Sequence, residues 1–161
     1  MQFASKQYSR DVRLEAARFI RQMCSTSTLT LQMFIACRGL PVLVENLDTV
    51  HYRDTNQLVH MAIDGIRSVF QLQSPTPKND FCRLFVKCDV LKHLANALLC
   101  TIKSPSAQEY ADKTADIFLL FSHGDAVVKK HMADPSSGGV LERTCQIAAG
   151  ELEKPANQPP N

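Results

Sequence analysis

Apolar residues along this chain recur three or four positions apart, and short polar stretches separate the resulting segments. The clearest case is residues 56–71, where the apolar residues share one face of a helical wheel: Leu58, Val59, Ala62, Ile63, Ile66, Val69 and Phe70. This spacing predicts a long amphipathic helix. The same pattern predicts further helices around residues 9–24, 29–38, 40–47, 81–85, 90–102, 111–121, 125–134 and 140–149.

The first of these helices has a polar side that is unusually rich in arginine. Its inward face is expected to hold Val12, Ala16, Phe19, Ile20 and Met23, and the opposite face Arg10, Arg13, Arg18 and Arg21. An arginine stripe of this kind is most often a solvated face. Two functional alternatives stay open, which are a surface for an acidic partner segment and a surface for nucleic acid.

Residues that favour helix ends mark several boundaries. Gly39 is expected to close the second helix in a left-handed conformation, and Pro41 to lie early in the third. In the stretch QLQSPTPKNDFCRLF (71–85), Thr76 is expected to cap a short helix that starts at Pro77.

The same stretch contains two Ser/Thr–Pro pairs, Ser74-Pro75 and Thr76-Pro77. Phosphorylation of Ser74 or Thr76 is therefore an alternative role for it. Similar turns at CSTSTLTLQM and FSHGDAVV favour a boundary between two helices of one repeat over a linker between domains.

The helical pattern repeats about every fifty residues. The segments IRQMC, IRSVF and IFLLF begin at residues 20, 66 and 117, so the steps are 46 and 51 residues. Leu40, Val90 and Val140 lie 50 apart in three related segments. Each cycle contains a leading helix, a long central helix and a short third helix. This order predicts an all-α, armadillo/HEAT-like right-handed solenoid of about 2.5–3 repeats without a sheet.

The repeat region is expected to span residues 9–149, with an N-terminal extension at 1–8 and a Pro-rich disordered tail at 150–161. The first cycle lacks a leading helix, and the last cycle ends just after one. Terminal repeats of a solenoid normally carry a polar outer face. The chain is therefore expected to be a piece of a longer array.

The composition argues against several classes of protein. A net charge of +2 over 161 residues is too balanced for a typical nucleic-acid-binding domain, and no apolar run is long enough to span a membrane. The N-terminus lacks the apolar core of a signal peptide. The cysteines are expected to be reduced, buried thiols of a cytosolic protein: Cys24, Cys37, Cys82, Cys88, Cys100 and Cys145.

Catalytic and cofactor motifs are absent from the sequence. It has no Gly-rich phosphate loop and no kinase H-R-D or D-F-G motif, so no cofactor is expected. A small all-α enzyme or metal-binding protein is kept as the alternative. Its metal ligands would be Cys82, Cys88 and His93, whose spacing lacks a C-x-x-C knuckle. Its catalytic pair would be His60 and Asp64. These residues are four positions apart, and the simpler interpretation is an exposed pair on one helix face.

A binding role is the better expectation for a helical solenoid. In armadillo arrays the third helices line an extended groove that takes partner segments. If the short helices are those third helices, their net basic surface suits an acidic or phosphorylated protein segment, and self-association is a further possibility. The candidate groove residues are Gln32, Arg38, Lys78, Asn79, Arg83, Lys129 and Lys130.

Three blocks of the sequence carry a family resemblance: STLTLQMFIACRGLPVLVENL (27–47), SVFQLQSPTPKNDFCRLF (68–85) and DIFLLFSHGDAVVKKHMAD (116–134). They resemble the armadillo-type C-terminal region of fungal septation-initiation protein kinases of the mitotic-exit class, which are related to plant kinases of the MAP-kinase-kinase-kinase epsilon type. The resemblance covers about residues 10–134.

The resemblance implies a non-catalytic scaffolding module that serves localisation, self-association or partner docking in septation and cytokinesis. The whole protein of such a family carries a Ser/Thr kinase domain, which this sequence lacks, so the chain itself is not expected to be an enzyme. Its expected place is the cytoplasm, at the spindle pole or the division site.

Overall fold

The computed structural model describes residues 2–5, 7–48, 56–72 and 76–152. Within these ranges the chain is helical and contains no β-strand, so the all-α prediction is confirmed. A short 3-10 helix precedes the α-helices. The elements are η1 Gln2–Ala4, α1 Arg10–Ser25, α2 Thr28–Ala36, α3 Gly39–Glu45, α4 Asn56–Gln71, α5 Lys78–Val86, α6 Val90–Thr101, α7 Ala107–Ser122, α8 Ala126–Ala133 and α9 Gly138–Leu152.

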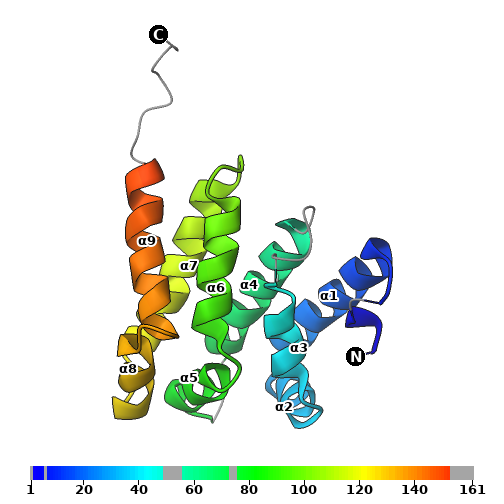
Figure 1. Ribbon diagram of the computed structural model, residues 1–161. Helices are drawn as coiled ribbons and strands as arrows, with labels where there is room; N and C mark the ends of the chain where they lie inside the picture. Colours follow the sequence, from blue (N-terminus) through cyan, green and yellow to red (C-terminus); the bar gives the residue numbers. More distant parts are fainter. Residues whose placement is uncertain (1, 6, 49–55, 73–75, 153–161) are drawn as a thin grey trace.

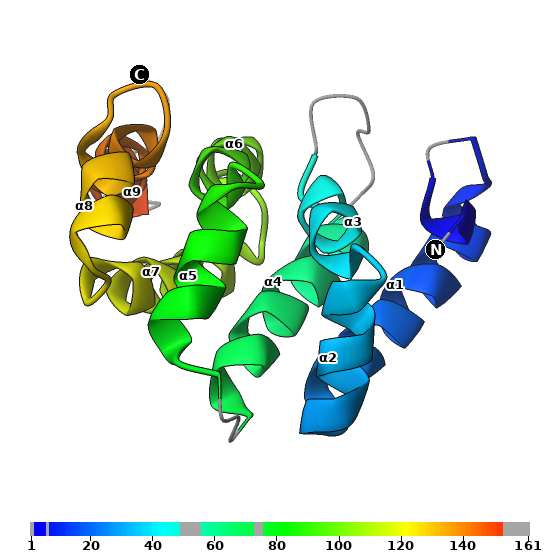
Figure 2. The ribbon, with the colours of Figure 1, turned by 90° about the horizontal axis from the view of Figure 1, so that it is seen from below.

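The helices form three rows that repeat along the molecule (Figure 1). The long helices α1, α4 and α7 form the layer at the back, and α3, α6 and α9 form the layer in front. The short helices α2, α5 and α8 lie below both layers, and Figure 2 shows them from that side. The long helices begin at residues 10, 56 and 107. Their steps of 46 and 51 residues are those that the sequence pattern predicts.

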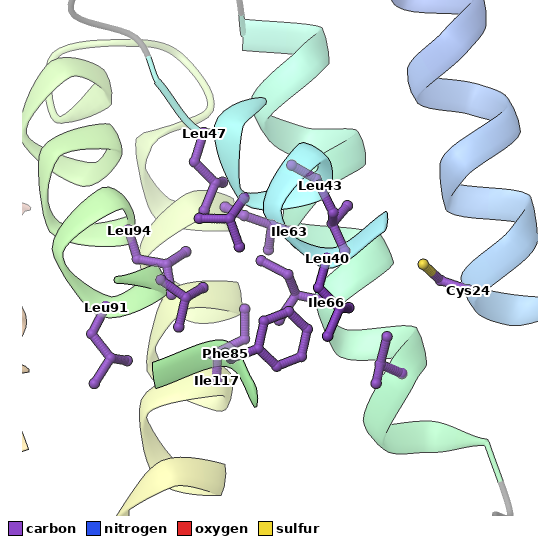
Figure 3. Packing of buried hydrophobic residues seen from close by; sticks show 14 of the residues in the cluster. Cys24, Leu40, Leu43, Leu47, Ile63, Ile66, Phe85, Leu91, Leu94 and Ile117 are labelled. Atoms are coloured by element: carbon purple, nitrogen blue, oxygen red, sulfur yellow. The ribbon is translucent and has the colours of Figure 1, made fainter. Parts of the chain in front are cut away.

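The core runs continuously between the rows (Figure 3). Side chains from α3, α4, α5, α6 and α7 meet there, among them Leu43, Ile66, Phe85 and Leu94. Burying a side chain of this size stabilises the fold by about 1.5–3 kcal/mol relative to leaving it in water. An aromatic group contributes to the same core, because the ring of Phe70 lies within about 6 Å of three others: those of Phe81, Phe85 and Phe121.

The turn between the short and leading helices uses a left-handed residue, but that residue is not a glycine. Arg38 has a φ of 57° and Asp89 a φ of 54°, at corresponding places in two successive cycles. The prediction for Gly39 was therefore wrong. Gly39 is the first residue of α3, and a Cβ on it would overlap the buried ring of Phe34. Glycine is needed here for space rather than for its backbone freedom.

The start of α5 also lies one residue later than predicted. Pro77 is the N-cap with a ψ of 141°, outside the helical region, and its carbonyl accepts a hydrogen bond from the Asp80 N–H at 3.0 Å. Thr76 lies outside the helix rather than at the cap. Ser74 is outside the described residues.

Helix α1 faces the core with a different side from the one predicted. Its buried residues are Arg13, Leu14, Ala17, Ile20 and Cys24, so the predicted face is displaced by one residue. The displacement leaves Val12 38% exposed and Phe19 62% exposed. The cause is that α1 carries two apolar faces. One of them packs against α4, where Leu58 and Met61 contact Leu14 and Ala17. The other lies beside Phe3 of η1 and stays largely exposed.

The ends of the chain extend the repeat region slightly. The segment η1 packs on α1, and α9 continues through residues 150–152, which the sequence assigned to the tail. The rest of the predicted tail, 153–161, lies outside the described residues.

The cysteines differ in burial more than expected. Cys24 and Cys82 are buried, whereas Cys37 and Cys100 are exposed, contrary to the prediction. Cys37 follows the last turn of α2, and Cys100 shares the outer side of α6 with the exposed Leu99. Within the described ranges no single helix is long and apolar enough to cross a membrane, although α2 and α3 pass that test as a pair bent by 86°.

Candidate protein-interaction surface

The seven predicted groove residues are spread along the row of short helices. Gln32 lies on α2 and Arg38 at the turn after it, and both are exposed. Lys129 and Lys130 are exposed on α8. The remaining three lie on α5, where Lys78 is exposed and the other two contact α8: Asn79 and Arg83.

Asn79 and Arg83 join α5 to the start of α8. Arg83 donates through Nε to Asp125 Oδ2 at 2.8 Å, and its Nη2 binds the same oxygen. Asn79 Oδ1 accepts from the Asp125 N–H at 2.8 Å. The other carboxylate oxygen of Asp125 accepts from Val127 N and Val128 N and caps α8. Two of the predicted groove residues therefore hold successive cycles together.

Asp125 was not among the predicted site residues. Its position before the apolar run AVV is a helix-start signal, which predicts a cap but cannot predict a partner 42 residues earlier in the chain. The Arg83 guanidinium, together with the Val128 N–H, lowers the pKa of Asp125 to about 2.

Acid is expected to weaken this junction. Because the pKa of Asp125 is lower in the folded than in the unfolded chain, its contribution to stability is complete above about pH 4 and is lost as the pH falls toward 2. Replacing Asp125 with asparagine should remove that part of the pH dependence. Urea unfolding of both chains at pH 6 and pH 3 measures it. Equal losses of stability in both chains would contradict the prediction.

A hollow lies where the C-terminal halves of α4 and α7 meet the start of α5. Its volume is about 520 Å³. Leu119 on its wall is 57% exposed, and Arg67 of α4 pairs with Asp116 of α7 across it at 2.8 Å. The lining residues are Arg67, Phe70, Gln71, Lys78, Asp116, Leu119, Leu120 and His123.

Of the seven predicted residues, only Lys78 lines this hollow. The sequence assigned the groove to the short helices, whereas the hollow is walled mainly by two long helices. A signal was nevertheless present, because Leu119 lies outside the periodic apolar stripe of its helix. An exposed leucine beside cationic groups is suited to a segment that has both an apolar side chain and a negative charge.

Charged residues connect the long helices above the hollow. Asp64 of α4 binds Lys113 of α7 at 2.8 Å and lies 3.8 Å from Arg21 of α1. Lys113 also binds Glu109 at 2.9 Å. Asp64 therefore links α4 to α1 through Arg21 and to α7 through Lys113.

The same contacts argue against a catalytic pair of His60 and Asp64. The carboxylate of Asp64 is used by Lys113, and the ring of His60 lies 4.0 Å from that of Tyr110. Burial lowers the pKa of His60. A histidine whose ring packs at a tilt against a buried tyrosine ring has a packing role.

The metal alternative likewise finds no support in the geometry. In the part of the chain that the structure describes, no three His, Cys, Asp or Glu side chains come together as a metal site, and this includes Cys82, Cys88 and His93. Burial raises the pKa of Cys24 to about 12 and that of Cys82 to about 11, so both stay protonated and unreactive at neutral pH.

The arginine stripe on α1 does not form one surface. Arg13 is buried, contrary to the prediction, because the helix turns a different face to the core. Arg18 pairs with Glu15 at 2.8 Å. With one member buried and another paired, the stripe is no continuous basic surface for nucleic acid.

Comparison with known proteins identifies relatives over most of the chain. Cytokinesis protein sepH of Aspergillus terreus is 46% identical over 135 residues, which are 83% of this chain and 10% of that protein. MAP3K epsilon protein kinase 1 of Arabidopsis thaliana is 53% identical over 90 residues, which are 56% of this chain and 6% of that protein. Cell division control protein 7 of Schizosaccharomyces pombe is 32% identical over 134 residues, 82% of this chain and 12% of that protein.

This chain is related to one region of the sepH and MAP3K epsilon proteins. The resemblance seen in the three sequence blocks is therefore confirmed. No family model matches the sequence, and no solved structure matches it. The matched part of the chain spans between 6% and 12% of the length of these relatives. It is a small region without a complete kinase domain.

Proposed function

We propose that the chain is a non-catalytic protein-interaction module of armadillo type that belongs to a cell-division kinase. Three rows of helices, with long helices that begin 46 and 51 residues apart, support a solenoid of about 2.5–3 repeats. The names of two relatives supply the process, cytokinesis and cell division. The module would act in the cytoplasm at the division site by displaying a rigid surface to a partner.

The hollow between α4, α5 and α7 is the observation that carries this proposal. It combines exposed Leu119 with Lys78 and His123 at its rim. Its floor is rigid, since Phe70 belongs to the aromatic group of the core. A preformed hollow that combines apolar side chains with the cationic Lys78 suits a protein segment with an apolar side chain beside an acidic or phosphorylated one.

Two positions could supply the cationic surface, and charge reversal separates them. Lys78 lines the hollow, whereas Lys129 and Lys130 lie on α8 in the row below. Peptides selected from a displayed random library against the intact chain should be enriched in acidic residues next to apolar ones. Lys78→Glu and Leu119→Asp should each weaken their binding at least about tenfold.

The matched control is the double variant Lys129→Glu, Lys130→Glu, which adds more negative charge away from the hollow. Its affinity for the same peptides, measured by fluorescence anisotropy, should stay near that of the original chain. Loss of binding only in this control would place the docking surface on α8 instead. A library that yields no specific peptide would count against the module as a peptide-binding surface.

A further inference from the structure

The outer side of α1 carries an apolar face that η1 borders along one side and that is otherwise largely exposed among the described residues. Phe19 and Phe3 are 62% and 60% exposed, and Val12 lies beside them. These side chains and their neighbours enclose a hollow of about 500 Å³. Its lining residues are Phe3, Asp11, Val12, Glu15, Ala16, Phe19 and Ile20. A protruding aromatic ring and an apolar hollow thus share one face.

The repeat itself indicates what this face does elsewhere in the molecule. Because α4 follows α1 by 46 residues, Val12 corresponds to Leu58 and Phe19 to Gly65. In α4 that face is buried against α1. Leu58 packs with Leu14 and Ala17. A Cβ on Gly65 would be 2.9 Å from Leu43 of α3 and 3.9 Å from the Arg21 Cα. The outer side of α1 is therefore a helix-packing face of a kind already used once in this chain.

The charges along the edge of this face show how a second helix would be oriented. Asp11, Glu15, Arg18 and Gln22 follow one another at spacings of three and four residues, so they form one line along α1. Along this line the charge changes from negative at Asp11 and Glu15 to positive at Arg18. The line is complementary to a copy of itself only when the two helices are antiparallel, because Asp11 then lies beside Arg18 of the other copy.

We propose that this face binds a second copy of the chain, with the two α1 helices antiparallel about a two-fold axis. Such an interface is self-complementary: Phe19 of each copy enters the hollow beside Val12 and Ala16 of the other. Buried aromatic side chains at the centre and charges at the rim are the usual anatomy of protein interfaces. The dimer leaves the hollow at α4 and α7 free, since its lining shares no residue with this face.

Sedimentation equilibrium of the intact chain tests this proposal. A reductant keeps the exposed Cys37 and Cys100 from linking copies covalently. The chain should show a reversible monomer–dimer equilibrium. Phe19→Asp should raise its dissociation constant at least roughly 30-fold, which corresponds to about 2 kcal/mol. Val127→Asp, an equally drastic change at a residue that is 57% exposed on α8, should leave the equilibrium unchanged.

A charge exchange tests the antiparallel arrangement without touching the apolar face. Arg18→Glu should weaken the dimer, and adding Asp11→Arg to it should restore the affinity. Circular dichroism confirms that each variant remains folded, as expected for side chains on the surface. A chain that stays monomeric at every concentration, assembly beyond dimers, or a failed rescue would overturn the proposal. If the chain stays monomeric, the α1 face would instead bind a helix of a different protein.

Discussion

Replacing Leu94 with alanine is expected to lower the free energy of unfolding by about 2–5 kcal/mol. Leu94 has no exposed surface and lies where side chains from α3, α4 and α6 meet (Figure 3). The substitution removes buried apolar atoms and leaves a cavity, because the surrounding helices are held by their other contacts and cannot close it. A loss of this size is a large part of the total stability of a small domain.

Leu99 provides the matched control on the same helix. It is 44% exposed, so Leu99→Ala removes the same atoms with a smaller loss of buried area and leaves no closed cavity, and it should cost no more than about 1 kcal/mol. Urea unfolding followed by circular dichroism measures both variants against the original chain. If the two substitutions had equal effects, the core would not be continuous across the rows.

The helices were predictable because each of them is decided by local spacing. Helix α4 begins and ends at the predicted residues 56 and 71, and its apolar stripe has neighbours on both sides. Helix α1 was predicted in position but not in orientation. Its sequence contains two apolar faces, and periodicity alone does not say which of them has a partner. The exposed Phe19 is the visible result of that choice.

The surface was less predictable for a different reason. Whether a charged side chain is available to a partner depends on residues about fifty positions away. Arg83 was chosen as a groove residue, and the structure pairs it with Asp125. Lys78, only five residues earlier, lines the hollow. Their helix assignment is the same, and only the packing of α5 against α7 and α8 separates their roles.

Two surfaces on opposite parts of the repeat would allow one chain to dimerise and bind a partner at the same time. Dimerisation through α1 would bring two copies of the α4–α7 hollow into one assembly. A partner with two suitable segments would then bind more tightly than each hollow alone allows, provided that its linker spans the distance. Phe19→Asp would remove the contribution of dimerisation to the binding affinity, and Lys78→Glu that of each single hollow.

Gly39→Ala is expected to destabilise the chain by about 1–3 kcal/mol, although alanine is the better helix former. Gly39 begins α3, and a Cβ on it would overlap the ring of Phe34, which is 2% exposed and cannot move into solvent. Gly150 in α9 is the opposite case, since nothing lies within 4 Å of a Cβ added there. Gly150→Ala should therefore leave stability unchanged or raise it by up to about 1 kcal/mol.

A double-mutant cycle identifies the ring as the cause. Phe34→Ala alone should cost about 3–5 kcal/mol, but in that background Gly39→Ala should cost nothing further, because the overlapping atoms are gone. Thermal or urea unfolding of the four chains gives the coupling energy directly. If Gly39→Ala costs the same with and without Phe34, the glycine is required for its backbone and not for the space that it leaves.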